Sequence, residues 1–74
     1  MKAEYLLIAA GGATLIALTE PTQRDAKQSL NHLCGKGYQF FRLLRWDREH
    51  ACYLENARLK AVVHAALKET KVSA

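Results

Sequence analysis

Two histidine–cysteine pairs have the residue types and spacing closest to those of a metal or catalytic site. They are His32 with Cys34, and His50 with Cys52. Four nitrogen and sulfur ligands suit a tetrahedral zinc ion. In a strand, His50 and Cys52 share a face, whereas in a helix His32 and Cys34 point about 200° apart and cannot bind one ion. We therefore expect no metal site, with the cysteines buried as small hydrophobic residues and the histidines on the surface.

The same side chains offer a cysteine nucleophile with a histidine base, because such partners meet in space rather than in sequence. The sequence has no glycine-rich phosphate loop, no G-x-S-x-G and no H-E-x-x-H. A short chain uses most of its interior as core, so that even a pocket of ~300 Å³ is hard to enclose. We predict that the protein is not an enzyme and uses no cofactor.

The length and charge of the chain exclude some classes of protein. The chain has 74 residues, of which half are hydrophobic, and 11 basic against 7 acidic residues give a net charge of +4. This composition excludes a disordered acidic tail, and the length allows one domain, residues 1–74. Because so short a chain buries only roughly 60% of its unfolded surface, we expect it to pair with itself or with a partner.

Two cysteines are too few for the disulfide framework of a small secreted domain, which indicates reduced thiols and a cytoplasmic location. The uncharged run of residues 5–18 is shorter than the roughly 20 residues of a membrane-spanning helix. Glu4 and the central Gly11-Gly12 pair also argue against a signal peptide. No membrane partner is expected.

The first half of the chain predicts two strands and a helix. Gly11-Gly12 separates apolar runs at 4–10 and 13–18, as in a hairpin, although one apolar helix over 5–18 is the alternative. A helix is expected from about residue 21 to 34, with Thr22 or Thr19 as its N-cap and Gly35 as a left-handed C-cap.

The second half predicts strands at 37–46 and 51–55, separated by a polar turn, and a final helix capped by Asn56. In the longer strand, either Phe41 or Phe40 faces the helices. An apolar stripe runs along the final helix: Leu59, Val62, Val63, Ala66 and Leu67. The order ββαββα indicates an α+β, two-layer domain, with a four-stranded, mainly antiparallel sheet and two helices on one face.

The first strand is apolar on both faces, which predicts that the second sheet face or an edge is covered by another copy or a partner. We therefore expect a regulatory or accessory interaction module, of the kind that bacterial, plasmid or phage genomes encode. It would bind a protein partner and form a homodimer. An exposed tryptophan beside arginines is typical of binding hot spots, which nominates as contact residues Arg42, Arg45, Trp46 and Arg48.

Nucleic-acid binding is the alternative function. Arginines alternate with aromatic residues over 38–48, a composition that suits stacked bases and phosphates. Residues 36–43 resemble the RNA-recognition-motif signature K/R-G-F/Y-G/A-F-V-x-F/Y, but the companion aromatic strand is absent and the fold is not carried over. The candidate contacts are Lys36 and Tyr38 with a basic stripe on the final helix: Lys60, His64, Lys68 and Lys71.

A second resemblance lies where the first helix turns into the third strand. Residues 30–41 are similar to the pattern L-N-x-L-G-x-x-G-W-E-L-V of a family of small bacterial β-α-β-β domains of unknown function. The residues that match in kind are Leu30, Asn31, Leu33, Gly37 and Tyr38. Cys34 stands where the family has glycine. The resemblance implies this local fold and no activity, and the final helix lies outside it.

Overall fold

A computed structural model describes the backbone of residues 3–72 and the side chains of residues 3–69. The elements in chain order are β1 (Tyr5–Gly11), β2 (Thr14–Glu20), α1 (Gln23–Gly35), β3 (Phe40–Asp47), β4 (Cys52–Leu54) and α2 (Ala57–Val72). This order confirms the predicted α+β fold with its ββαββα arrangement.

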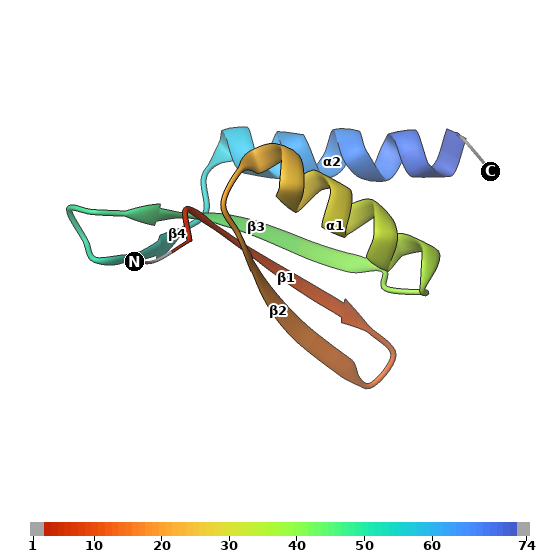
Figure 1. The fold of residues 1–74 in the computed structure, drawn as a ribbon. Helices are drawn as coiled ribbons and strands as arrows, with labels where there is room; N and C mark the ends of the chain where they lie inside the picture. The colour runs from red at the N-terminus through yellow and green to blue at the C-terminus, as the bar shows by residue number, and fades with distance from the viewer. Residues whose placement is uncertain (1–2, 73–74) are drawn as a thin grey trace.

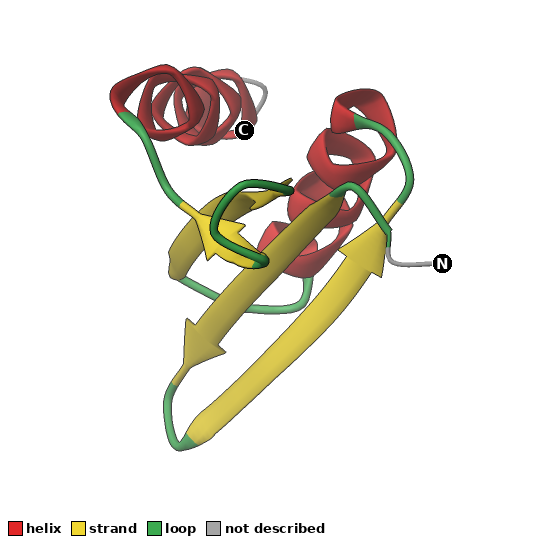
Figure 2. Cartoon of the chain, turned by 90° about the vertical axis from the view of Figure 1, so that its left-hand side faces the viewer, coloured by secondary structure: helices red, strands yellow, loops and turns green. Residues whose placement is uncertain are grey.

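The four strands form one antiparallel sheet in the order β2-β1-β3-β4 (Figure 1). β1 is therefore a central strand, paired with β2 on one side and with β3 on the other. Both helices lie on the same side of the sheet, as Figure 2 shows. The predicted two-layer arrangement is confirmed.

The predicted hairpin forms, but its turn is shifted by one residue. Gly11 is the last residue of β1 and pairs with Thr14, so the two-residue turn is Gly12-Ala13. Gly12 has a φ of 59°, and a glycine with positive φ at the first central position suits a type II′ turn. The alternative of one apolar helix over residues 5–18 is wrong.

The structure shows which of the predicted caps are present at the two ends of α1. Thr22 is the N-cap, because its hydroxyl accepts a hydrogen bond of 3.1 Å from the backbone N–H of Asp25. The prediction for Gly35 is wrong, since Gly35 is the last helical residue. Positive φ falls instead on Gly37, at 101°, which turns the chain toward β3.

The boundaries of β3 and β4 also differ from the prediction. β3 begins at Phe40 and includes Asp47, while β4 is limited to three residues. His50 therefore lies in the turn and does not share a strand face with Cys52. Ala51 closes this turn with a φ of 51°, a conformation that costs a residue with a Cβ about 1–2 kcal/mol.

The core lies between the helices and one face of the sheet. Leu7 of β1, Leu30 of α1 and Leu43 of β3 are its most deeply buried large side chains. Asn56 caps α2 as predicted, because its side-chain oxygen accepts a hydrogen bond of 2.9 Å from the backbone N–H of Leu59. The predicted α2 stripe is confirmed: Leu59, Val63 and Ala66 are buried, and Val62 and Leu67 pack against them.

Gly11 marks a close approach between the hairpin and the segment before β3. A Cβ built on Gly11 lies 2.9 Å from the Cα of Tyr38 and 3.1 Å from the carbonyl oxygen of Gly37. The hydrogen bond from the Gln39 N–H to the Ala10 carbonyl, at 3.0 Å, holds the two segments together. A side chain at this position must displace backbone.

We expect Gly11→Ala to destabilise the fold by about 1–3 kcal/mol through overpacking. The measurement is the free energy of unfolding from urea titration. Gly35→Ala is the matched control, because its Cβ meets no atom within 4 Å and alanine favours the helix by about 0.5–1 kcal/mol. A Gly11→Ala variant as stable as the Gly35→Ala variant would contradict the close approach.

Candidate functional site

The sheet face opposite the helices is largely apolar, and neither described helix covers it. In β1, Tyr5, Leu7 and Ala9 are buried beneath the helices, while the alternate residues point to the other side and stay half-buried. Register extends that side across β2 and β3. We call these nine residues the open sheet face: Leu6, Ile8, Ala10, Leu15, Ala17, Thr19, Phe40, Arg42 and Leu44.

The nine residues form three rows across the strands. In the first row, Ala10 lies between Leu15 and Phe40, which are 71% and 70% exposed. The second row is Ala17, Ile8 and Arg42, and the third is Thr19, Leu6 and Leu44. Arg42 is the only charged residue of the nine, so this surface presents hydrocarbon to water over most of its width.

Leu15 and Phe40 were not among the predicted site residues. The signal that identifies them is strand alternation, which places Leu15 with Ala17 and Thr19, and Phe40 with Leu44. The open choice between the two phenylalanines is settled by the register, because Phe41 opposes the buried Ala9 and packs against the core.

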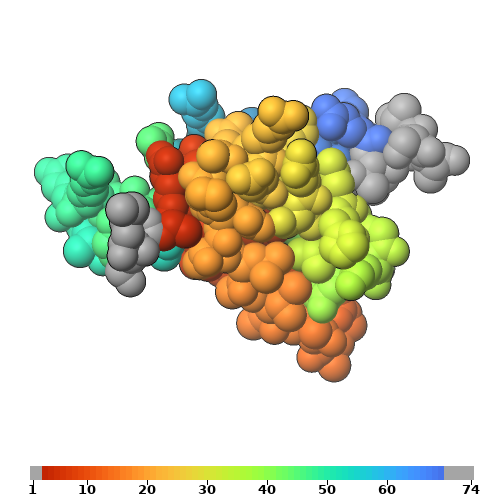
Figure 3. All heavy atoms as spheres, in the orientation of Figure 1, coloured from red at the N-terminus to blue at the C-terminus, as the bar shows by residue number. Residues whose placement is uncertain are grey.

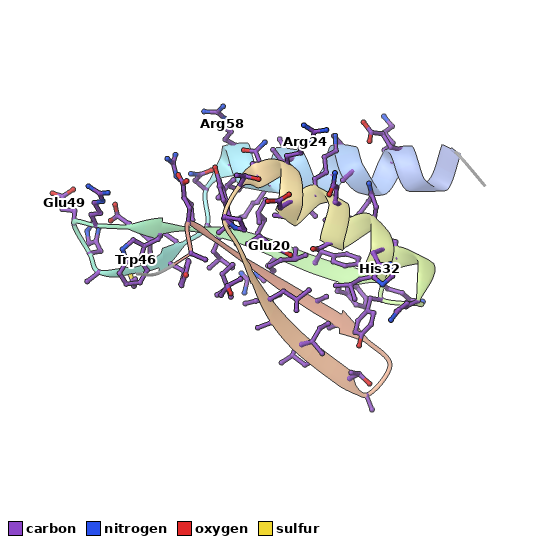
Figure 4. The ribbon with its side chains drawn as sticks, viewed as in Figure 1. Glu20, Arg24, His32, Trp46, Glu49 and Arg58 are labelled. Atoms are coloured by element: carbon purple, nitrogen blue, oxygen red, sulfur yellow. The ribbon has the colours of Figure 1, made fainter. Side chains whose placement is uncertain are left out.

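The four predicted partner contacts do not lie together. Arg42 is on the open sheet face, where its Nη2 lies 3.2 Å from the Glu55 Oε1. Arg45, Trp46 and Arg48 instead line a shallow hollow at the β3–β4 end of the molecule, where Figure 4 places Trp46. The open sheet face is therefore formed mainly by apolar residues, and three of the four predicted contacts lie outside it.

Two of these residues have structural contacts that the sequence analysis did not foresee. The Arg45 Nη2 lies 2.6 Å from the Glu4 Oε1, and its guanidinium carbon is 5.9 Å from the centre of the Tyr5 ring. Trp46 is half-buried and packs edge-to-face on Tyr53, with ring centres 5.1 Å apart. The expectation that Trp46 is exposed is wrong, because its side chain is half-buried.

The residues proposed for nucleic-acid contact differ in place and exposure. Lys60, His64 and Lys68 are exposed at four-residue spacing along α2, which places them on one side of that helix. The side chain of Lys71 lies outside the described residues. Lys36 is exposed after α1, whereas Tyr38 is half-buried against the core cluster.

The two histidine–cysteine pairs lie far apart. Figure 4 shows His32 at one end of the molecule and Glu49, the neighbour of His50, at the other. Among the described residues, no three histidine, cysteine or acidic side chains are grouped to hold a metal ion. The histidines are exposed as predicted, but the cysteines differ: Cys34 is half-buried and Cys52 is exposed.

One electrostatic contact stabilises the β3–β4 turn. The Asp47 carboxylate accepts hydrogen bonds from the imidazole Nδ1 and the backbone N–H of His50, the latter at 3.2 Å. The side-chain hydrogen bond from His50 is the main cause that lowers the pKa of Asp47 below its usual value. The contact holds the turn that carries Arg48.

Comparisons with protein families, with curated proteins and with solved structures find no match to this chain. The resemblance of residues 30–41 to a small bacterial domain family stays a prediction. Among the described residues, neither helix is long and apolar enough to cross a membrane.

We expect Asp47→Asn to reduce stability at neutral pH and to lose this effect in acid. The folded pKa of Asp47 is depressed, so the contact stabilises the fold above the unfolded value of about 3.9 and is lost as the pH falls through the folded value. Urea unfolding of both proteins from pH 7 down to about pH 3 measures the difference.

Glu49→Gln is the control for this change, because it removes a negative charge from the same turn and leaves the His50 hydrogen bonds to Asp47 in place. A stability difference between wild type and Asp47→Asn that is constant over the acid range would refute the role of this carboxylate.

Proposed function

We propose that the protein is a small, non-enzymatic interaction module that binds a protein partner, and a second copy of itself, through the open sheet face. The observation that carries this proposal is the row of Leu15, Ala10 and Phe40, with two large apolar side chains exposed on a face that neither helix covers. Large exposed apolar patches mark interaction sites more often than they occur by accident.

The shape of the face also supports pairing with a second sheet. Two sheets pack face to face when large side chains of one fit beside small side chains of the other. Here Ala10 forms a low point between Leu15 and Phe40, and Ala17 forms another beside Ile8. Such an alternation of large and small residues allows the same patch to serve both sides of a two-fold contact.

The charge of the face is compatible with two copies of a basic protein. Arg42 is its only charged residue and is already paired with Glu55. The charge of +4 resides on other surfaces, so that apposed faces bring no unpaired cations together. Binding through this face would depend little on salt.

The proposed role requires binding alone and no enzymatic activity. A cytoplasmic location is the simplest setting for the exposed thiol of Cys52. A regulatory or accessory role would follow from binding alone.

We expect wild type to have twice the mass of one chain by light scattering, unchanged by salt, and Ala17→Glu to weaken dimerisation at least a hundredfold. A carboxylate buried in an apolar contact costs about 3 kcal/mol or more, which gives this factor. Thr14→Glu is the matched control, because Thr14 is exposed on the same strand with the opposite alternation.

The same experiment tests the nucleic-acid alternative. A wild-type monomer that gains mass with RNA or DNA only at low salt would overturn the proposal and favour the α2 stripe, since phosphate contacts depend steeply on salt. Equal mass for wild type and Ala17→Glu at every concentration would also overturn self-association through this face.

A further inference from the structure

In the described residues, part of the outer edge of β3, on the side away from β1, has no strand paired with it. β4 pairs with β3 only at Arg45, Trp46 and Asp47. In the described part of the chain, the preceding segment, Phe40–Leu44, therefore has a strand neighbour on the β1 side alone. An unpaired strand edge is a template on which another extended chain adds by backbone hydrogen bonds.

α2 runs beside this edge in the direction opposite to β3 (Figure 1). Between them lies a groove of about 600 Å³, to which the edge of the sheet and the helix both contribute. Its apolar lining includes Ala10 and Phe40 from the sheet and Val63 and Leu67 from α2. A helix parallel to an open edge leaves room for one extended strand, with alternate side chains turned toward the helix.

The charged residues of the groove indicate what kind of extended segment it would bind. Lys60 and His64 of α2 line it and are exposed. Arg42 and Glu55 also line it, but they form an ion pair with each other. The groove is therefore positively charged beside an apolar floor, which favours an extended segment that alternates acidic and apolar residues.

We propose that the groove between β3 and α2 binds an extended acidic peptide segment, which adds as a fifth strand to the edge of β3. The site goes beyond the proposed function, because it adds the edge of β3 and α2 to a part of the open sheet face that it shares, which includes Ala10 and Phe40. Lys60 and His64 belong to the groove alone, and Ala17 belongs to the face alone. The two surfaces can therefore be tested separately.

A peptide accounts for the groove better than a single-stranded nucleic acid does. Nucleic acid binds through aromatic faces on which successive bases stack. The groove contains two aromatic residues, and Phe41 is packed against the core. The rest of its lining is aliphatic or polar, so that Phe40 is the one exposed phenylalanine on which a base could stack. The open edge of β3 is therefore the main binding element of the groove.

The test is fluorescence anisotropy of full-length protein with a labelled peptide in which glutamate and valine alternate. We expect this peptide to bind at least tenfold more tightly than the peptide with lysine in place of glutamate. The same peptide with alternate backbone nitrogens methylated should lose binding at least tenfold, because it lacks the N–H donors of a strand. Amide exchange in residues 40–44 should slow when the peptide binds.

The variant pair Lys60→Glu with His64→Glu should weaken peptide binding about tenfold or more, as expected for the loss and reversal of surface charges beside an acidic ligand. The matched control reverses Arg24 and Arg58 to glutamate. Figure 4 shows both side chains pointing away from the sheet, and this control changes the net charge at least as much. It should bind the peptide within about threefold of wild type.

The groove proposal would be overturned by equal binding of the acidic and basic peptides, or by full binding of the methylated peptide. It would also be overturned by displacement with single-stranded DNA that is lost in the Lys60→Glu, His64→Glu variant, a result that assigns the surface to nucleic acid. Failure of peptide binding in a protein that dimerises through Ala17 refutes the groove and leaves the proposed function intact. An Ala17→Glu monomer that still binds the peptide supports a groove that binds independently of dimerisation.

Discussion

The central strand β1 is apolar on both faces, and the chain has helices for one of them. Leu7 and Ala9 are fully enclosed beneath α1 and α2, whereas Leu6, Ile8 and Ala10 stay half-buried on the other side. Transfer of such side chains out of water contributes roughly 25 cal/mol per Å². This unequal coverage leaves one face of β1 enclosed in the core and the other partly exposed to water.

The central position of β1 explains how the sheet is stable although the core is small. β1 pairs along its length with both β2 and β3, so its backbone groups are satisfied even where its second face is not covered. The tip of the β1–β2 hairpin and the β3–β4 turn project beyond the helical layer (Figure 3). The chain thus places extended surface where a more compact domain would have filled its second layer.

Much of the fold could be predicted because its signals are local. A Thr22 hydroxyl three residues before the Asp25 N–H, Asn56 ahead of Leu59, and a glycine pair between apolar runs each specify an element from a few neighbouring residues. The candidate site is harder to predict from the sequence, because it depends on the pairing register of β1 with β2. With the turn at Gly11-Gly12, Leu15 would oppose Ile8; the one-residue shift places it beside Ala10 and creates the exposed row. Likewise, no sequence spacing indicates that Arg45 reaches back to Glu4 across the sheet.

The strand order has a consequence for synthesis on the ribosome. β1 and β2 emerge first, yet the sheet cannot be completed until α1 has been made and β3 has returned to pair with β1. During that interval the nascent hairpin carries apolar side chains on both faces and an unpaired β1 edge, the condition in which partly folded chains aggregate. α1 is the first element able to shield it, through Leu30 and Ala26. The order in which the chain is translated therefore gives this helix a protective task before the core exists.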